Sequence, residues 1–143
     1  MDGIRQLFSG LRTSSTGLLA ERQRIDVIAK NIANASATNT PEGGPYRRRI
    51  VQFEPMLEKM LGGETRVTGV RVAGVVPDTS TAFEQIHDPS HPDADADGMV
   101  LLPNVNATRE MADMITAMRA YEANLTAQET FVRMAERALR LAQ

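Results

Sequence analysis

A seven-residue spacing of apolar side chains near both ends of this 143-residue chain limits its fold more than any other feature. A heptad series of this kind is typical of a long helix that packs along its length against other helices. In the N-terminal segment, the series and its apolar companions are Ile4, Leu7, Leu11, Leu18, Ile25, Ile28 and Ile32. In the C-terminal segment, they are Met111, Met114, Met118, Tyr121, Leu125, Val132 and Leu139. We therefore predict two long helices, and we expect these two sets of residues to form interfaces between subunits.

Local signals indicate where the two helices end. Asn34 lies where the first apolar series stops, and Asn106 is a suitable N-cap shortly after Pro103. The predicted divisions are an N-terminal helix in residues 1–35, a loop and small β region in residues 36–104, and a C-terminal helix in residues 105–143. Helices of this length favour a coiled-coil stalk, and a compact antiparallel bundle is the alternative.

Glycine recurs with the same seven-residue spacing in the N-terminal helix, at Gly3, Gly10 and Gly17, beside the Ser and Thr residues of 13–16. Each glycine inside a helix costs about 1 kcal/mol relative to alanine, so this helix is marginal by itself. A row of glycines also lets a neighbouring helix approach closely. We expect packing against other elements to supply the stability of this helix.

The central region has the alternation and the turn residues of short strands. The stretches YRRRIVQF and RVTGVRVAGVV predict two strands, and FEQIHD predicts a third. So small a β element is not expected to bury a stable core alone, because domains below roughly 40 to 60 residues usually need a metal, a disulfide or a partner. The basic run at residues 47–49 is interpreted as a solvated or partner-facing strand edge. The predicted fold class is mainly α with a small β element.

Composition and motif content argue against several classes of function. The chain has no cysteine, which excludes thiolate chemistry, and its net charge of −2 argues against a protein that mainly holds nucleic acid. His87 and His91 have the spacing of a helical zinc pair, but Pro89 disrupts the helix that this spacing requires. We predict a protein without catalytic activity or cofactors. We also expect no direct membrane insertion, because polar residues interrupt every apolar stretch.

The sequence DADADG at residues 93–98 is similar to the first half of an EF-hand loop, with Asp93, Asp95 and Asp97 followed by a glycine. The twelfth loop position carries Asn104 rather than the glutamate that would bind calcium with two oxygens. Prolines before the loop disfavour the helix that should enter it. We therefore favour an acidic turn, and a calcium-binding module is the alternative.

The ends of both helices resemble the flagellar rod and hook protein family. DVIAKNIANASATNT contains the asparagine, alanine and second asparagine with which the N-terminal helix of that family closes. The segment from the acidic turn into the C-terminal helix is similar to the short proximal-rod members of the family, although Met99 stands where an aromatic residue is common. The matching residues are Asn31, Ala33, Asn34, Pro103, Asn104, Val105, Asn106, Glu110, Met111, Tyr121, Glu122 and Asn124.

This resemblance implies a structural subunit of the flagellar basal-body rod. Such a subunit would assemble helically with other copies of itself and with other rod proteins, and would transmit torque from motor to hook. The resemblance also implies a coiled-coil-like terminal domain (D0), export by the flagellar type III apparatus without a cleaved secretory signal, and a place in the periplasmic rod. The acidic turn would lead into the C-terminal helix. A cytoplasmic coiled-coil adaptor that uses the same heptads is a further alternative.

Overall fold

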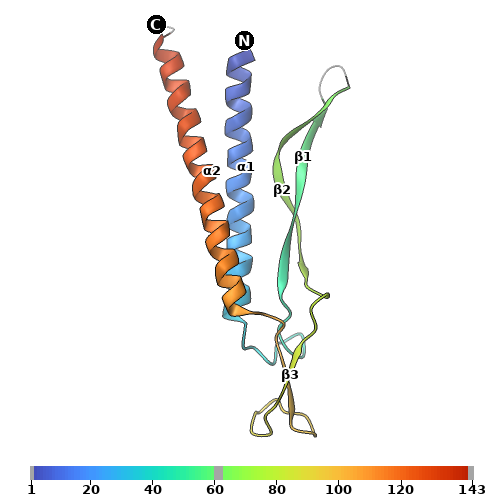
Figure 1. Cartoon of the computed structure of the whole chain (residues 1–143). Helices are drawn as coiled ribbons and strands as arrows, with labels where there is room; N and C mark the ends of the chain where they lie inside the picture. The colour runs from blue at the N-terminus through green and yellow to red at the C-terminus, as the bar shows by residue number, and fades with distance from the viewer. Residues whose placement is uncertain (1, 60–62, 142–143) are drawn as a thin grey trace.

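The computed structural model describes residues 2–59 and 63–141, with side chains described from residue 8 onward except at residue 141. The side chains of Ile4 and Leu7 therefore lie outside the described residues. The elements in chain order are α1 (Asp2–Ala33), β1 (Arg49–Lys59), β2 (Thr65–Pro77), β3 (Glu84–His87), β4 (Met99–Leu102) and α2 (Ala107–Leu141). The fold mixes helix and strand. In sequence order, the predicted long helices come first and last, and the β region comes between them (Figure 1).

α1 lies between two neighbours. Figure 1 shows α2 along one side of α1 and the β1–β2 hairpin along the other, with both chain termini at the same end of the molecule. α1 contacts α2 and both strands of the hairpin. The two helices thus run antiparallel within one chain, as in the bundle alternative, and the coiled-coil-like terminal domain stays a prediction. This arrangement supplies the packing that the glycine content of α1 requires.

Two glycines bring α1 close to α2. A Cβ atom at Gly10 would lie within 3.0 Å of the ring of Phe131, and a Cβ atom at Gly17 would lie 2.9 Å from Oδ1 of Asn124. These contacts step by seven residues along each helix, in opposite directions. The expectation that the glycine row allows a close neighbouring helix is confirmed at these two positions.

Side-chain hydrogen bonds mark the two helix ends that the sequence predicts. α1 ends at Ala33, and Nδ2 of Asn34 donates to the carbonyl of Lys30 at 2.8 Å. α2 begins at Ala107, where Oδ1 of Asn106 accepts the N–H of Arg109 at 3.0 Å. Asn106 thereby satisfies one of the free amides of the first helical turn, as an N-cap does. Both predicted ends agree with the structure.

The β region consists of two antiparallel hairpins that form separate sheets. β1 pairs with β2 with register shifts at Gln52/Phe53 and at Met56/Leu57, and β3 pairs with β4. The three predicted strands are present. β4 goes beyond the prediction, because its sequence MVLL is short and lacks alternation. The acidic turn joins β3 to β4, so it leads to α2 through a strand rather than directly.

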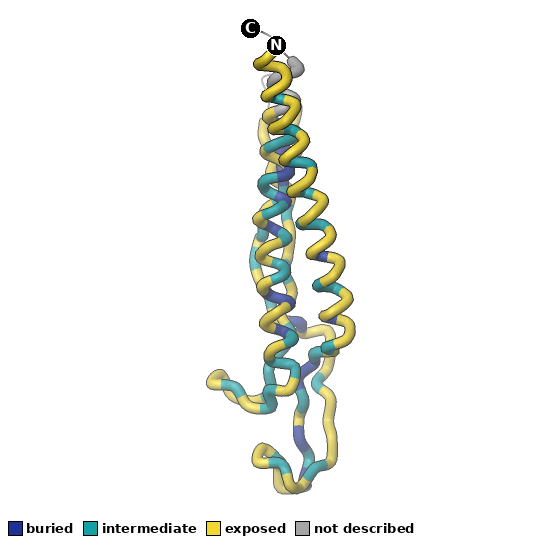
Figure 2. The backbone as a smooth tube through the Cα atoms, turned by 90° about the vertical axis from the view of Figure 1, so that its left-hand side faces the viewer, coloured by how far each residue is buried: buried dark blue, intermediate teal, exposed yellow. Residues whose placement is uncertain are grey.

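The apolar core is thin for a chain of this length. Its buried apolar side chains among the described residues are Ala20, Val27, Ile28, Val100 and Ala117. Figure 2 shows that most buried positions lie along α1 and near the end of the helix pair that adjoins the hairpins, whereas α2 is largely exposed. Polar contacts must therefore contribute much of what holds the two helices and the two hairpins together.

Candidate functional site

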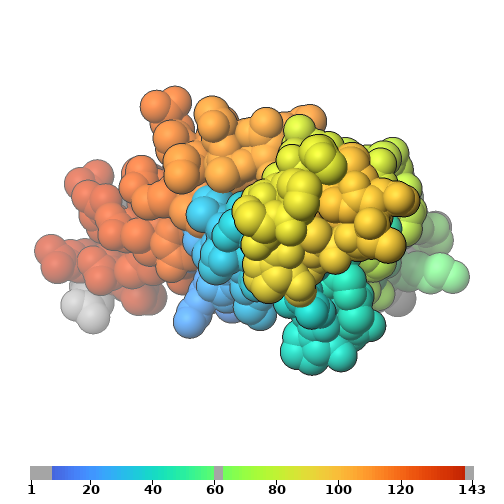
Figure 3. Space-filling view, turned by 90° about the horizontal axis from the view of Figure 1, so that it is seen from below, coloured from blue at the N-terminus to red at the C-terminus, as the bar shows by residue number. Residues whose placement is uncertain are grey.

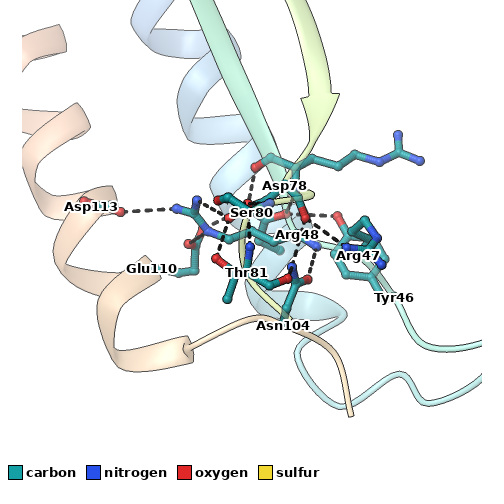
Figure 4. A network of polar contacts seen from close by, with 11 residues as sticks. Tyr46, Arg47, Arg48, Asp78, Ser80, Thr81, Asn104, Glu110 and Asp113 are labelled. Carbon is teal, nitrogen blue, oxygen red and sulfur yellow. Dashed lines mark hydrogen bonds and ion pairs between the residues drawn. The ribbon is translucent and has the colours of Figure 1, made fainter. Parts of the chain in front are cut away.

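Polar side chains from distant parts of the chain meet where the helix pair adjoins the hairpins (Figure 4). They come from the end of α1, the loop before β1, the loop after β2, and the segment that leads into the first turn of α2. We call this group the polar junction, and its members are Asn31, Tyr46, Arg48, Asp78, Asn104 and Glu110.

Asn31 and Glu110 link the two helices at the centre of the polar junction, and each is only 1% exposed. Nδ2 of Asn31 donates to Oε2 of Glu110 at 2.9 Å and to the carbonyl of Arg49 at 2.9 Å. Oδ1 of Asn31 accepts the N–H of Arg49 at 2.9 Å and the hydroxyl of Tyr46 at 3.0 Å. The amide thus uses its donors and its acceptor fully, so replacing it would leave several buried groups unpaired.

Arg48 connects the first turn of α2 to the loop after β2. Its Nε donates to Oε1 of Glu110 at 2.7 Å, and its terminal nitrogens lie 3.6 Å from Asp78 and 3.6 Å from Asp113. Burial disfavours the charged guanidinium, but the hydrogen bond and charge of Glu110 outweigh it and raise the pKa of Arg48. The arginine therefore stays charged while three carboxylates surround it.

Asp78 ties the end of β2 into the same network. Oδ1 of Asp78 accepts the hydroxyl of Ser80 at 2.6 Å, and Oδ2 accepts the hydroxyl of Thr81 at 3.0 Å. The backbone amides of Ser80 and Thr81 also donate to Oδ1. Hydrogen bonds from Ser80 and then Thr81 favour the carboxylate more than burial disfavours it, and they lower the pKa of Asp78 to about 2.

Asn104 holds the segment before α2 against this loop. Its Oδ1 accepts the N–H of Arg48 at 2.7 Å, and its Nδ2 donates to the carbonyls of Asp78 at 3.1 Å and Thr81 at 3.0 Å. Pro103 beside it is buried, and Val105 is half-buried. Asn104 is the twelfth position of the EF-hand-like pattern. In the structure, its side chain instead forms hydrogen bonds with the backbone of Arg48, Asp78 and Thr81.

The structure brings together three residues of the predicted motif, Asn31, Asn104 and Glu110. The interpretation of residues 47–49 as a solvated or partner-facing strand edge is wrong for Arg48, because acidic side chains of its own chain enclose that side chain. Asp78 also escaped the prediction, although the run DTST after β2 is a local signal for an aspartate that accepts hydrogen bonds from the following residues.

The side chains of the polar junction form hydrogen bonds with one another and with nearby backbone groups. Among the described residues, the buried side-chain oxygen that lacks a hydrogen-bond partner is Oε2 of Glu21, which lies outside the junction. Buried polar networks of this kind rigidify a structure when their members are satisfied. The geometry therefore suits the fastening of helices to hairpins, and it does not resemble a nucleophile poised beside a base.

The acidic turn lies at the end of the molecule that Figure 3 views, where the β3–β4 hairpin sits beside the loop after α1. Asp93 joins the two, because its carboxylate accepts the hydroxyl of Thr38 at 2.7 Å and the side-chain amide of Asn39 at 3.2 Å. Oδ1 of Asp95 instead accepts the N–H of Met99 at 2.8 Å, within the turn. Within residues 2–59 and 63–141, no three acidic or histidine side chains gather as a metal site requires.

A row of large apolar side chains follows the outer surface of α2. We call it the α2 stripe, and it consists of Met111, Met118, Leu125, Val132 and Leu139, which are between 41% and 69% exposed. Ile115 adds to it and is also exposed. The companions Met114 and Tyr121 are half-buried. Of the remaining motif residues on α2, Glu122 is exposed and Asn124 lies against Gly17.

The corresponding residues of α1 have a different setting. Ile28 is buried, and the others of the predicted set whose side chains are described are half-buried: Leu11, Leu18, Ile25 and Ile32. The chain's own α2 and hairpin flank this helix. The large apolar side chains that α1 leaves most exposed are Phe8 and Leu19, which were outside the predicted set. Spacing alone could not separate these two settings.

The described part of the chain includes no helix that is both long and apolar enough to cross a bilayer.

Two protein-family models match the chain. The model of the flagella basal body rod protein family covers residues 11–39, and that of the flagellar basal body rod FlgEFG protein C-terminal family covers residues 96–141. These two segments include the polar-junction residues Asn31, Asn104 and Glu110.

Individual relatives match over nearly the whole chain. The flagellar basal-body rod protein FlgC of Borreliella burgdorferi is 44% identical, over 96% of this chain and 98% of its own. FlgC of Bacillus subtilis is 36% identical, over 94% of this chain and 97% of its own, and FlgC of Salmonella typhimurium is 35% identical, over 91% and 93%. The predicted family resemblance is confirmed, and this chain belongs to the FlgC family of flagellar basal-body rod proteins.

Proposed function

We propose that this chain is a structural subunit of the bacterial flagellar rod and that it builds the proximal part of that rod. In this role it assembles helically with other copies of itself and with other rod proteins, and the assembly transmits torque from motor to hook. The family is one of structural rod proteins rather than enzymes. The comparisons give no support to a calcium-binding module or to a cytoplasmic adaptor.

The α2 stripe is the observation that carries the proposal of assembly. A contiguous row of large, exposed apolar side chains is a common mark of a protein interface, because burying it removes apolar surface from water. Thr116 and Thr126 on the same helix donate their hydroxyls to the carbonyls one turn earlier, at 3.0 Å and 2.9 Å. Their donor hydrogens are thus already used, so a neighbouring subunit would not have to supply an acceptor for them.

The two predicted interface sets contribute unequally in this proposal. The row on α2 is available to a neighbouring subunit over its whole described length. The row on α1 is available only at its edges, since those residues are half-buried or buried within the chain. We therefore assign the larger share of the contact between subunits to α2, with Phe8 and Leu19 adding exposed apolar surface on α1.

The route to the assembly site also belongs to this proposal. The rod lies in the periplasm, and we propose that the flagellar type III export apparatus delivers the subunit there. A chain with a thin apolar core and two long helices suits export in an unfolded form, because its net stability is expected to be modest.

The proposal is tested by placing a charge in the middle of the α2 stripe. In Leu125→Asp, an assembled rod would have to bury an unpaired carboxylate, so we expect rods to fail to assemble and the strain to lose motility. Ala123→Asp is the matched control, because Ala123 is exposed on α2 outside the stripe. A Leu125→Asp strain that swims with normal rods would contradict the assignment of the stripe as an interface.

A further inference from the structure

We propose that two threonines of α1 and a glycine of β2 form a latch that fixes where the β1–β2 hairpin lies along α1. The members of this hydroxyl latch are Thr13, Thr16 and Gly69. The latch is a positioning device, and it stands whether or not the α2 stripe proves to be an interface. It also gives a role to the two threonines of the Ser and Thr run of α1, Thr13 and Thr16.

Thr16 is the central member of the latch. Its Oγ1 accepts the backbone N–H of Val70 at 3.2 Å and donates to the carbonyl of Thr13 at 2.8 Å. A hydroxyl can do both at once because it has one donor hydrogen and two acceptor lone pairs. Thr16 therefore joins the backbone of its own helix to the backbone of β2. A side chain without a hydroxyl would leave the amide of Val70 without this acceptor.

Thr13 makes the neighbouring contact one turn earlier. Its hydroxyl lies 3.0 Å from the carbonyl of Ser9 and 3.3 Å from the carbonyl of Thr68, so it shares its hydrogen between the helix and the strand. Thr68 is buried and donates its own hydroxyl to the carbonyl of Met56 at 3.3 Å, across the hairpin. The register shift between Met56 and Leu57 lies at the same level. The latch thus contacts β2 where the strand pairing is irregular.

Gly69 allows the helix and the strand to come close enough for these bonds. A Cβ atom at this position would lie 3.0 Å from Cγ2 of Thr16, 3.1 Å from its Cβ, and nearer still to its Oγ1. Gly74, in the same strand, has open space around the corresponding position. β2 therefore contains one glycine that the latch requires and one that it does not.

Several other features of the hairpin contribute little to its position along α1. Its large apolar side chains Phe53, Leu57 and Val67 are between 41% and 62% exposed, so much of their surface does not pack against the helix. The ion pair between Arg12 and Glu58 is solvent-exposed on both sides, and exposed pairs contribute little. The base of the hairpin is held by the polar junction, where Asn31 binds Arg49. We infer that the latch sets the position of the hairpin beyond that base.

Hydrogen exchange on the purified full-length chain tests the latch at the amide it uses. In Thr16→Val, which keeps the shape and the β-branch, we expect the amide of Val70 to exchange about tenfold faster, because a hydrogen bond has been lost. In Thr16→Ser, which keeps the hydroxyl, the rate should stay near that of the parent. The amide of Arg49, which donates to Asn31, reports on the polar junction in the same sample and should not change.

A second pair of variants tests the role of Gly69. Gly69→Ala should accelerate exchange at Val70 as Thr16→Val does, because the added methyl group pushes the strand away from the helix, whereas Gly74→Ala should not. Unchanged exchange at Val70 in Thr16→Val, or equal acceleration in Thr16→Ser, would overturn the proposal. A parallel acceleration at Arg49 would also overturn it, since Thr16 would then act on the whole fold rather than on the position of the hairpin.

Discussion

The two long helices have similar apolar spacing and different surroundings. α1 is flanked by α2 on one side and by the β1–β2 hairpin on the other, and several of the positions where these neighbours come close are small or polar: Gly10, Gly17, Thr13, Thr16 and Asn31. Of the described helices and strands, α2 contacts only α1, and it leaves Met, Leu and Val side chains exposed. The comparison teaches that a heptad series reports on packing without revealing which chain provides the partner.

The difference between the helices also explains their compositions. A helix enclosed on two sides must let its neighbours approach closely, and glycine and small hydroxyl residues permit this at the cost of intrinsic helix stability. A helix with one open face can carry larger side chains, because it is not yet crowded on that side. In our account, α1 is the internal helix of the subunit and α2 is the helix that meets neighbouring subunits.

The largest expected effect concerns the point where the helices are fastened together. Glu110→Ala should lower the free energy of unfolding by about 3 kcal/mol, because it removes one partner of a buried ion pair and leaves Arg48 and Asn31 incompletely satisfied. Glu122→Ala on the exposed side of α2 is the control and should change stability by less than about 0.5 kcal/mol. Urea denaturation of the purified subunits measures both. Equal effects would show that the polar junction does not fasten the helices.

The comparison between the helices can be broken by placing the same charge on each. Leu18→Asp on α1 should lower the free energy of unfolding of the isolated subunit by about 2 kcal/mol, because Leu18 is half-buried within the chain. Leu125→Asp should change it by less than about 1 kcal/mol, because Leu125 is exposed in the subunit. Thermal or urea unfolding of both variants gives the answer. If Leu125→Asp were the more damaging in the isolated subunit, the contrast between an internal helix and an assembling helix would be lost.

A third test sharpens the comparison by probing the polar junction through pH. The pKa of Asp78 is lowered from 3.8 to about 2, chiefly by hydrogen bonds from Ser80 and Thr81. A carboxylate whose pKa is lower in the folded state contributes stability above its unfolded pKa, and this contribution is lost as pH falls toward the folded pKa. We therefore expect part of the stability to disappear between about pH 4 and pH 2. The Asp78→Asn variant should show a shallower loss over that interval in urea titrations, and an identical slope would contradict this role.

Periodicity and local capping signals were sufficient to predict the helices, because both depend on residues close together in the chain. Asn34 and Asn106 marked helix ends by their own side-chain chemistry. The ion pairs of Arg48 with Asp78 and Glu110 were not predictable in this way. These partners lie more than twenty residues from Arg48, and an arginine in a basic run looks solvated until the fold places Glu110 beside it.

The family motif named residues without revealing which partners they contact. Asn31 and Glu110 belong to motifs at opposite ends of the chain, and only the antiparallel helix pair brings them within 2.9 Å. The exposure of the α2 stripe was likewise hidden from the sequence, because the hairpin that covers one side of α1 docks through nonlocal contacts with Thr13 and Thr16. Heptad spacing does not indicate which of the two helices the hairpin packs against.

The most direct test of the central claim measures whether the α2 stripe is covered in the assembled rod. The chain has no cysteine, so Leu125→Cys creates a single thiol that a maleimide can label without background from this subunit. We predict that the thiol reacts readily in the isolated subunit, where Leu125 is 41% exposed, and is strongly protected in purified basal bodies that contain the same variant. Equal labelling in the isolated subunit and in the rod would contradict the claim that α2 meets its neighbours through this stripe.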